Sequence, residues 1–285
     1  MRHRLVMLTG LLLMAISSSL VGSAWGAETK ELRVCGDPDN LPFSNKKREG
    51  FENKIAEVIA KELGAELTYF WWPHQRGLIR STLKAGQCDV LISVPHGWEP
   101  VLWTKPYYRS GYVIVYPKDR GLKITSLNDP ILKQLKIGVY INSPPAEALA
   151  ENGIVKNVVG YNLLYDYRQD RPGKIIEDLI AGEIGVAVVW GPVAGHYTRK
   201  LNASHLEIVP LQGGGSSTPF TFEFSMGVRE GNKALKVQLE EALSKRQAEI
   251  QKILEDYGVP LLPLLAKGQF GPVKDQPGQI IYHRD

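Results

Sequence analysis

Polar and aromatic residues follow the short apolar runs of this 285-residue sequence, at the positions where strands of a parallel sheet would end. Ligands of open α/β sheets bind outside the carboxyl ends of the strands, so these residues are candidates for a binding cleft. Aromatic rings suit apolar, planar or cationic ligands, because each ring offers a large apolar area and a negative face. The candidate cleft residues are Asp37, Asn40, Phe43, Trp72, Arg76, His96, Trp98, Tyr140, Asn142, Ser143 and Trp190.

The same segments offer little for catalysis. A nucleophile with a base, or two opposed carboxylates, would be needed. The carboxylates present are Asp37, Asp39 and Glu99, and the possible bases are His74 and His96. We therefore expect no catalytic residue, no cofactor and no metal site.

Three of the candidates have two interpretations. Residues 37–40 carry the oxygen ligands that a hard cation prefers, but Asp and Asn at such spacing more often form a turn. Asn142 and Ser143 either cap a helix or place its N-terminus toward an anion, and we favour capping alone. Arg76 either holds an anion or begins a helix.

Apolar periodicity predicts strands that alternate with helices, which implies right-handed crossovers and a sheet buried on both faces. We expect an α/β fold in which each of two lobes has a mostly parallel sheet flanked by helices. The expected strands are residues 32–35, 67–72, 90–94, 112–116, 136–140, 185–190 and 222–228, and the expected helices are residues 51–63, 78–85, 146–151, 174–181 and two within 233–257.

The N-terminal residues predict an exported protein. Arg2 and Arg4 precede an apolar run, and small residues follow at positions 22–24. This order is typical of a secretory signal peptide, and the run is too short and too rich in serine for a membrane span. We expect cleavage after residue 24 or residue 27 and a periplasmic location.

The remaining length is enough for two lobes joined by two hinge crossings. We expect the signal peptide to cover residues 1–27, the first lobe residues 28–116 and 220–265, and the second lobe residues 117–219. Residues 266–285 contain glycine and proline without apolar periodicity, so we expect a flexible tail.

The formal net charge is +4, from 34 basic and 30 acidic residues. A charge this small gives little attraction to nucleic acid, so we expect no nucleic-acid partner. After the signal peptide no uninterrupted apolar stretch could span a membrane.

The two cysteines, Cys35 and Cys88, both lie in the part expected to be exported. An oxidising compartment favours a disulfide, which requires Cα atoms within about 7 Å. Cys35 lies late in its strand and Cys88 just before its own, so two buried thiols remain the alternative.

Several short motifs follow one another along the chain. They are LRVC (32–35) with Asp37-Pro38, NLPFS (40–44), GFENKIA (50–56), WWP (71–73), CDV (88–90), KPYYRS (105–110) and VWGP (189–192). In this order they resemble type II periplasmic solute-binding proteins of the two-lobed, venus-flytrap kind. More narrowly, they are similar to the J-type proteins associated with PQQ-dependent methanol dehydrogenases, particularly those that accompany the lanthanide-dependent enzyme.

The resemblance implies a non-catalytic accessory role in the maturation or activation of such a dehydrogenase. The implied partners are the dehydrogenase and its cytochrome c, with either a small apolar or aromatic ligand or a segment of the partner in the cleft. The alternative is the substrate-binding component of an ABC transporter for a small solute. A third hypothesis, a dehydratase that uses Asp37 or Glu99, has the least support.

One departure from relatives that bind amino acids is informative. Those proteins usually follow the third strand with an arginine for the ligand carboxylate and supply an aspartate for its amine. Here residues 95–103 contain no arginine, and Trp190 stands where the aspartate would be. A zwitterion would lie unpaired in a partly dry cleft, so we expect a ligand that is not an amino acid.

Overall fold

The computed structural model describes residues 30–75, 77–162, 172–212 and 219–265. The expected signal peptide, the expected tail and Arg76 lie outside the described residues. The strands are β1 (Glu31–Gly36), β2 (Asp39–Asn40), β3 (Ser44–Asn45), β4 (Glu66–Trp71), β5 (Val90–Pro95), β6 (Leu102–Trp103), β7 (Tyr108–Pro117), β8 (Ile137–Tyr140), β9 (Val158–Tyr161), β10 (Val186–Trp190), β11 (Leu206–Pro210) and β12 (Thr221–Val228). The helices are α1 (Phe51–Leu63), α2 (Leu78–Ser81), α3 (Pro144–Glu151), α4 (Lys174–Ile180), α5 (Gly191–Lys200), α6 (Lys233–Lys245) and α7 (Gln247–Asp256), with 3-10 turns at Lys118–Arg120 and Pro130–Gln134.

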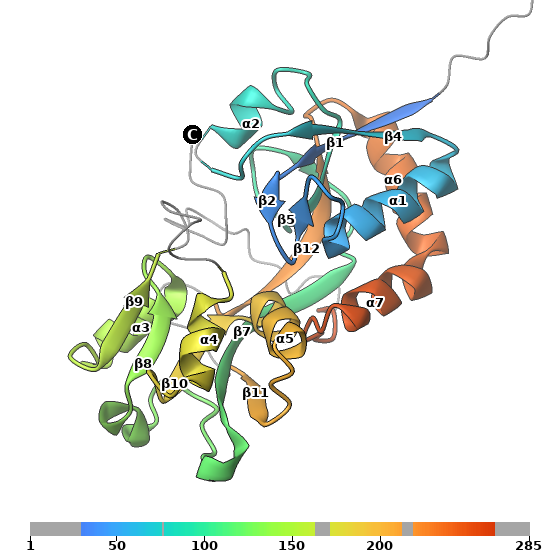
Figure 1. Cartoon of the computed structure of the whole chain (residues 1–285). Coiled ribbons are helices and arrows are strands. Elements are labelled where there is room, and N and C mark those ends of the chain that lie inside the picture. The colour runs from blue at the N-terminus through green and yellow to red at the C-terminus, as the bar shows by residue number, and fades with distance from the viewer. Residues whose placement is uncertain (1–29, 76, 163–171, 213–218, 266–285) are drawn as a thin grey trace, which may run out of the picture.

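The elements form two lobes, as expected (Figure 1). One lobe contains β1, β4, β5 and β12 with α1, α2, α6 and α7, and the other contains β8 to β11 with α3, α4 and α5. Ten strands form one continuous sheet in the order β4-β1-β5-β12-β7-β10-β8-β9, with β6 beside β12 and β11 beside β7.

The sheet is more mixed than expected. β1 runs parallel to β4 and β5, and β8 runs parallel to β9 and β10. β12 is antiparallel to both β5 and β7, and β10 is antiparallel to β7. The reason is that β7 carries the chain out of the first lobe and β12 carries it back, so the two run in opposite directions.

Strand β7 belongs to both lobes. Tyr108 to Gly111 pair with β12, and Tyr112 to Val115 pair with β10. The sequence predicts a strand only from Tyr112, because Arg109, Ser110 and Gly111 interrupt the apolar run. The first crossing between the lobes is therefore one continuous strand, paired with β12 at its start and with β10 further along.

Helix α1 shows how local sequence places an element. Phe51 and Ile55 recur at helical spacing, and both side chains are fully buried. The Asn53 side-chain oxygen accepts the Gly50 N–H at 3.1 Å at the start of the helix. Gly64 ends the helix at φ 60°, a conformation that glycine adopts without the steric penalty of a Cβ.

Several elements differ from those that the sequence predicts. Helix α2 ends at Ser81 instead of residue 85, because Thr82 leaves helical geometry with φ −119° and ψ −88°. The prediction omits the strands β2, β3, β6, β9 and β11, and it omits helix α5, which begins directly after the expected strand 185–190. Within the described residues, no helix is both long enough and apolar enough to cross a membrane.

Candidate functional site

A disulfide joins Cys35 and Cys88, with their Cα atoms 5.4 Å apart. Both residues are buried in a small apolar cluster on one side of the first lobe, which also contains Leu78 of α2. The rings of Trp72 and Trp98 are half-buried and pack against this cluster. The apolar cluster around the disulfide therefore supports the rings of two predicted cleft residues, Trp72 and Trp98.

The loop after β1 and the loop after β4 meet at Asp37. One oxygen of its carboxylate accepts the Asp39 N–H at 3.0 Å, and the other accepts the His74 N–H at 2.6 Å. The Asp37 side chain is buried, so both oxygens are held by backbone donors away from water. Residues 37–40 therefore form a turn, which is one of the two interpretations given above; the other was a site for a hard cation. No group of three or more metal-ligating side chains occurs among the described residues.

A buried carboxyl that the sequence prediction omits lies beside this junction. Glu52, in the first turn of α1, is 6% exposed, and burial raises its pKa to about 8. A hydrogen bond with Ser93 of β5 opposes this rise, and the nearby charge of Asp37 adds to it. The only sequence signal is an acidic residue within the apolar stretch that begins α1.

The two histidines near the predicted cleft are both less basic than usual. Burial lowers the pKa of His74, against the opposing attraction of the Asp37 charge. Burial also lowers the pKa of His96, whose Nδ1 lies 2.8 Å from the Ser225 hydroxyl and whose ring centroid lies 4.5 Å from that of Trp103. Both side chains are held within the fold by specific neighbours.

An aromatic cluster fills the crossing between the lobes. The Trp190 ring centroid lies 5.2 Å from Tyr112, 6.0 Å from Phe222 and 5.8 Å from Phe224. Phe224 in turn stacks on Tyr108 at 4.8 Å. Trp190 is 4% exposed, and its indole nitrogen has no hydrogen-bond partner among the described residues. We call these five residues the crossing cluster.

Two further candidates lie apart from this cluster, within the first lobe. Phe43 is buried against Phe51, with ring centroids 5.2 Å apart, so its ring is part of the core. Asn40 is half-buried, and its carbonyl accepts the Phe43 N–H at 2.8 Å in the tight turn between β2 and β3.

The second-lobe candidates after β8 are also held by local bonds. The Tyr140 hydroxyl donates to the Pro172 carbonyl at 2.5 Å. Ser143 occupies the N-cap position of α3, but its hydroxyl donates to the Tyr140 carbonyl at 2.6 Å and makes no cap bond. The expected side-chain cap is therefore wrong at Ser143. Asn142 is exposed at φ 56°.

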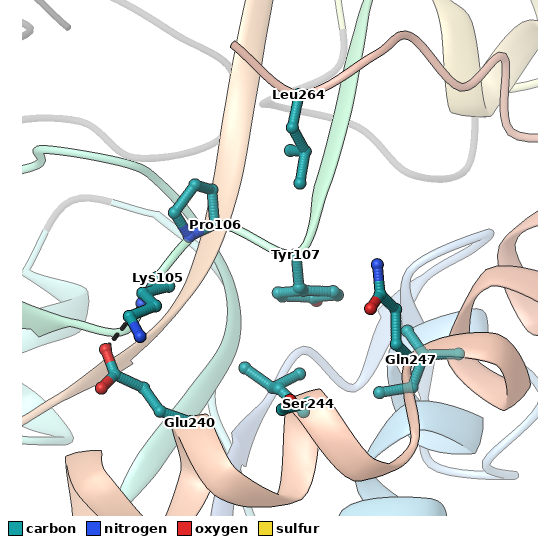
Figure 2. Close-up of a pocket in the computed structure, with 9 residues that line it drawn as sticks. Lys105, Pro106, Tyr107, Glu240, Ser244, Gln247 and Leu264 are labelled. Carbon is teal, nitrogen blue, oxygen red and sulfur yellow. Dashed lines mark hydrogen bonds between the residues drawn. The ribbon is translucent and has the colours of Figure 1, made fainter. Parts of the chain in front are cut away.

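A pocket of about 190 Å³ lies elsewhere in the first lobe, between residues 105–107, helices α6 and α7, and Leu264. Figure 2 shows the Tyr107 ring between Leu264 and Ser244, with Gln247 beside it. At the rim of the pocket, the Glu240 carboxylate accepts the Lys105 backbone N–H at 2.9 Å. This pocket could not be predicted from the sequence, because its residues come from three distant segments.

The sequence profile of the bacterial extracellular solute-binding proteins, family 3, matches residues 32–260. The chain belongs to this family. Its two-lobed fold is the type II fold of periplasmic binding proteins, as the resemblance implies.

Relatives of this solute-binding protein place it more narrowly. Protein MoxJ of Methylorubrum extorquens is 32% identical over 265 residues, which cover 87% of this chain and 87% of MoxJ. The crystal structure of periplasmic binding protein XoxJ from Methylobacterium extorquens AM1 is 38% identical with a TM-score of 0.69, over 82% of this chain and all of XoxJ. That of MxaJ from Methlophaga aminisulfidivorans MPT is 30% identical with a TM-score of 0.71, over 81% of this chain and all of MxaJ. The J-type resemblance is thereby confirmed.

Proposed function

We propose that this solute-binding protein is a non-catalytic periplasmic accessory factor of a PQQ-dependent methanol dehydrogenase, which it helps to mature or activate. Its similarity to MoxJ, XoxJ and MxaJ supports this role, because J-type proteins are associated with such dehydrogenases. The identity of 38% to XoxJ, against 30% to MxaJ, favours the lanthanide-type enzyme. The proposed partners are the dehydrogenase and its cytochrome c.

The observation that carries the proposal is the environment of Trp190. Three aromatic rings surround this buried indole at the crossing of the lobes, a fourth stacks on one of them, and none carries a charge at neutral pH. An amino acid bound beside it would bury its carboxylate against rings that offer no positive partner, which is unfavourable by several kcal/mol. An apolar segment of a protein partner, or a small aromatic compound, meets no such penalty.

We keep the lobe boundaries and the cleft of the sequence prediction as parts of this proposal. The lobes comprise residues 28–116 with 220–265 and residues 117–219. The proposed cleft residues are Asp37, Asn40, Phe43, Trp72, Arg76, His96, Trp98, Tyr140, Asn142, Ser143 and Trp190. Of these, Asp37, Phe43, Tyr140, Ser143 and Trp190 are buried.

Reconstitution tests the proposal. The mature protein would be mixed with the dehydrogenase and the cytochrome c of the same organism and examined by native mass spectrometry. A complex with the dehydrogenase is expected, together with no calorimetric response to glutamate, lysine or arginine. Absence of any complex, combined with micromolar binding of one of these amino acids, would overturn the proposal.

Family membership itself favours a second candidate, the substrate-binding component of an ABC transporter for a small non-amino-acid solute. This function predicts that the protein purified from periplasm carries a tightly bound small molecule. The same mass spectrum would show a ligand mass in place of a protein partner.

A further inference from the structure

The sheet of the first lobe ends at β4, and the outward backbone groups of this strand face no other strand of the described residues. β4 stands at one end of the ten-stranded sheet, and no other described strand pairs with its outer side. The N–H groups of Glu66 and Trp72 both donate to the adjoining chain, at Lys30 and Gly36. Since backbone groups alternate in direction along a strand, those of Leu67, Tyr69 and Trp71 point outward.

This edge lacks the features that normally prevent pairing with another chain. Exposed edges usually carry lysine, proline or a bulge. Residues 67–71 contain no charge and no proline, and the register with β1 is unbroken over six residue pairs. Figure 1 shows β4 at the outer side of its lobe, with α1 beside it.

Stacked aromatic rings line both faces of the edge strand. Tyr69 and Trp71 stack on one face with centroids 4.5 Å apart and planes 6° apart. Phe70 and Trp72 stack on the other face at 6.2 Å. A strand added alongside would find aromatic surface on each side of it, which is where cross-strand pairs contribute.

The charges around Tyr69 decide what kind of chain fits. The Arg48 guanidinium lies 5.0 Å from the Tyr69 ring centroid, and Lys46 and Lys47 beside it are also exposed. Of the nearby carboxylates, Glu57 pairs with Lys54, whereas Glu49 accepts from the neutral Asn45 side chain and keeps its charge, so the three exposed cations at residues 46–48 outnumber it. The α1 face of the edge is therefore positive.

A second copy of this chain is a poor occupant. Antiparallel pairing of two β4 strands about a two-fold axis preserves the faces of the sheet. Tyr69 would then lie beside its own copy, and the two Arg48 side chains would come together on one face. An extended segment with an acidic residue on that face places opposite charges together instead.

We propose that the β4 edge binds an extended, acidic segment of another protein by β-strand addition. Backbone groups of Leu67, Tyr69 and Trp71 bond the added strand, and an acidic side chain of that strand pairs with Arg48. This surface is separate from the crossing cluster. A failed test of the edge interaction would therefore leave the proposed accessory role untouched, and the reverse also holds.

A capped hexapeptide, Thr-Val-Glu-Val-Thr-Val, is the probe. We expect it to slow hydrogen exchange at the amides of Leu67, Tyr69 and Trp71 and at no outward amide elsewhere. A version that is N-methylated at alternate residues should not bind, because it cannot complete the ladder. Equal binding of the methylated peptide, or unchanged exchange at these three amides, would overturn the proposal.

The charge pairing has its own test. Replacing the peptide glutamate by lysine should weaken binding roughly fivefold to tenfold, and Arg48→Glu should reverse this preference. Lys61→Glu, at the far end of α1, is the matched control and should leave both affinities unchanged. Sedimentation provides a further test, since a dimer that protects the same amides without peptide would show that the occupant is a second copy.

Discussion

The hydroxyl of Tyr107 lies 3.1 Å from the hydroxyl of Ser93 and donates to the Ile92 carbonyl at 3.0 Å. Ser93 also forms a hydrogen bond with the Glu52 side chain, and this bond lowers the pKa of the carboxyl, as a hydroxyl that donates to the ionised form does. Burial outweighs this bond and raises the pKa of Glu52 to about 8 in the folded protein.

The protonated state of Glu52 predicts a pH-dependent stability. Its pKa is about 8 in the folded protein and near the ordinary value of 4.5 in the unfolded chain. The folded state therefore retains the proton longer, and its stability falls as the pH rises from 4.5 through about 8. Glu52→Gln should remove this loss, which amounts to a few kcal/mol on the order-of-magnitude relation of about 1.4 kcal/mol per pKa unit.

Urea unfolding from about pH 7 to about pH 9 measures the last part of this loss, about 1.4 kcal/mol, and avoids the titration of His74. The pKa of His74 is lowered, so its own contribution is lost only as the pH falls below the ordinary value of 6.5. Glu57→Gln, in the same helix but half-buried, is the control and should keep the wild-type slope. Parallel curves for wild type and Glu52→Gln would show that Glu52 is already ionised.

The disulfide should contribute strongly to stability. Cys35 and Cys88 are separated by 53 residues, and closing such a loop in the unfolded chain corresponds to about 4 kcal/mol. The double variant Cys35→Ala with Cys88→Ala should lose about this much in urea unfolding. Dithiothreitol should destabilise the wild type by a similar amount and leave the variant unaffected; an equal response of both proteins would contradict the prediction.

The ring of Trp190 should matter more than its indole nitrogen for folding. Trp190→Ala removes contacts with three rings at the crossing of the lobes and should cost about 3 to 5 kcal/mol. Trp190→Phe keeps an aromatic ring in the cluster and should cost less than about 2 kcal/mol. Equal losses for the two variants in chemical unfolding would indicate that ring packing is unimportant there.

Helix α5 approaches the end of α7 too closely for a side chain at Gly195. A Cβ at this position would lie 1.7 Å from the Gly258 carbonyl oxygen, which belongs to the backbone and cannot rotate away. We expect Gly195→Ala to cost more than about 3 kcal/mol.

A second glycine variant separates crowding from backbone strain. Gly153 has a φ of +70°, but no heavy atom lies within 4 Å of the position that a Cβ would take, so Gly153→Ala should cost only about 1 kcal/mol. Thermal unfolding of the two variants distinguishes the two causes. Similar melting temperatures would rule out the close contact between the helices.

Elements with strong local signals could be predicted from the sequence. α1 has both an apolar repeat that begins at Phe51 and a glycine stop at Gly64, and these signals agree. α5 could not be recognised, because Gly191, Pro192 and Gly195 resemble a loop until the close packing against Gly258 is known. β9 and β11 are short and only partly buried, so their apolar alternation is weak.

The direction of side chains was harder to predict than the elements that carry them. Trp71 and Trp72 point to opposite faces, as alternation requires, yet both are half-buried because β4 is an edge strand. Trp190 and Phe43 follow or end strands, which suggested a cleft wall, but their rings turn into packed clusters. Glu52 was overlooked, since nothing local shows that Ser93 and Tyr107 enclose it.

Because β7 is hydrogen-bonded to a strand of each lobe, sliding one lobe past the other would break ladders on both sides. The pairing of β7 passes from β12 to β10 between Gly111 and Tyr112, so a change in the angle between the lobes would have to bend the strand there. A stiff connection of this kind favours binding a partner of constant shape over closing around small solutes of varied size.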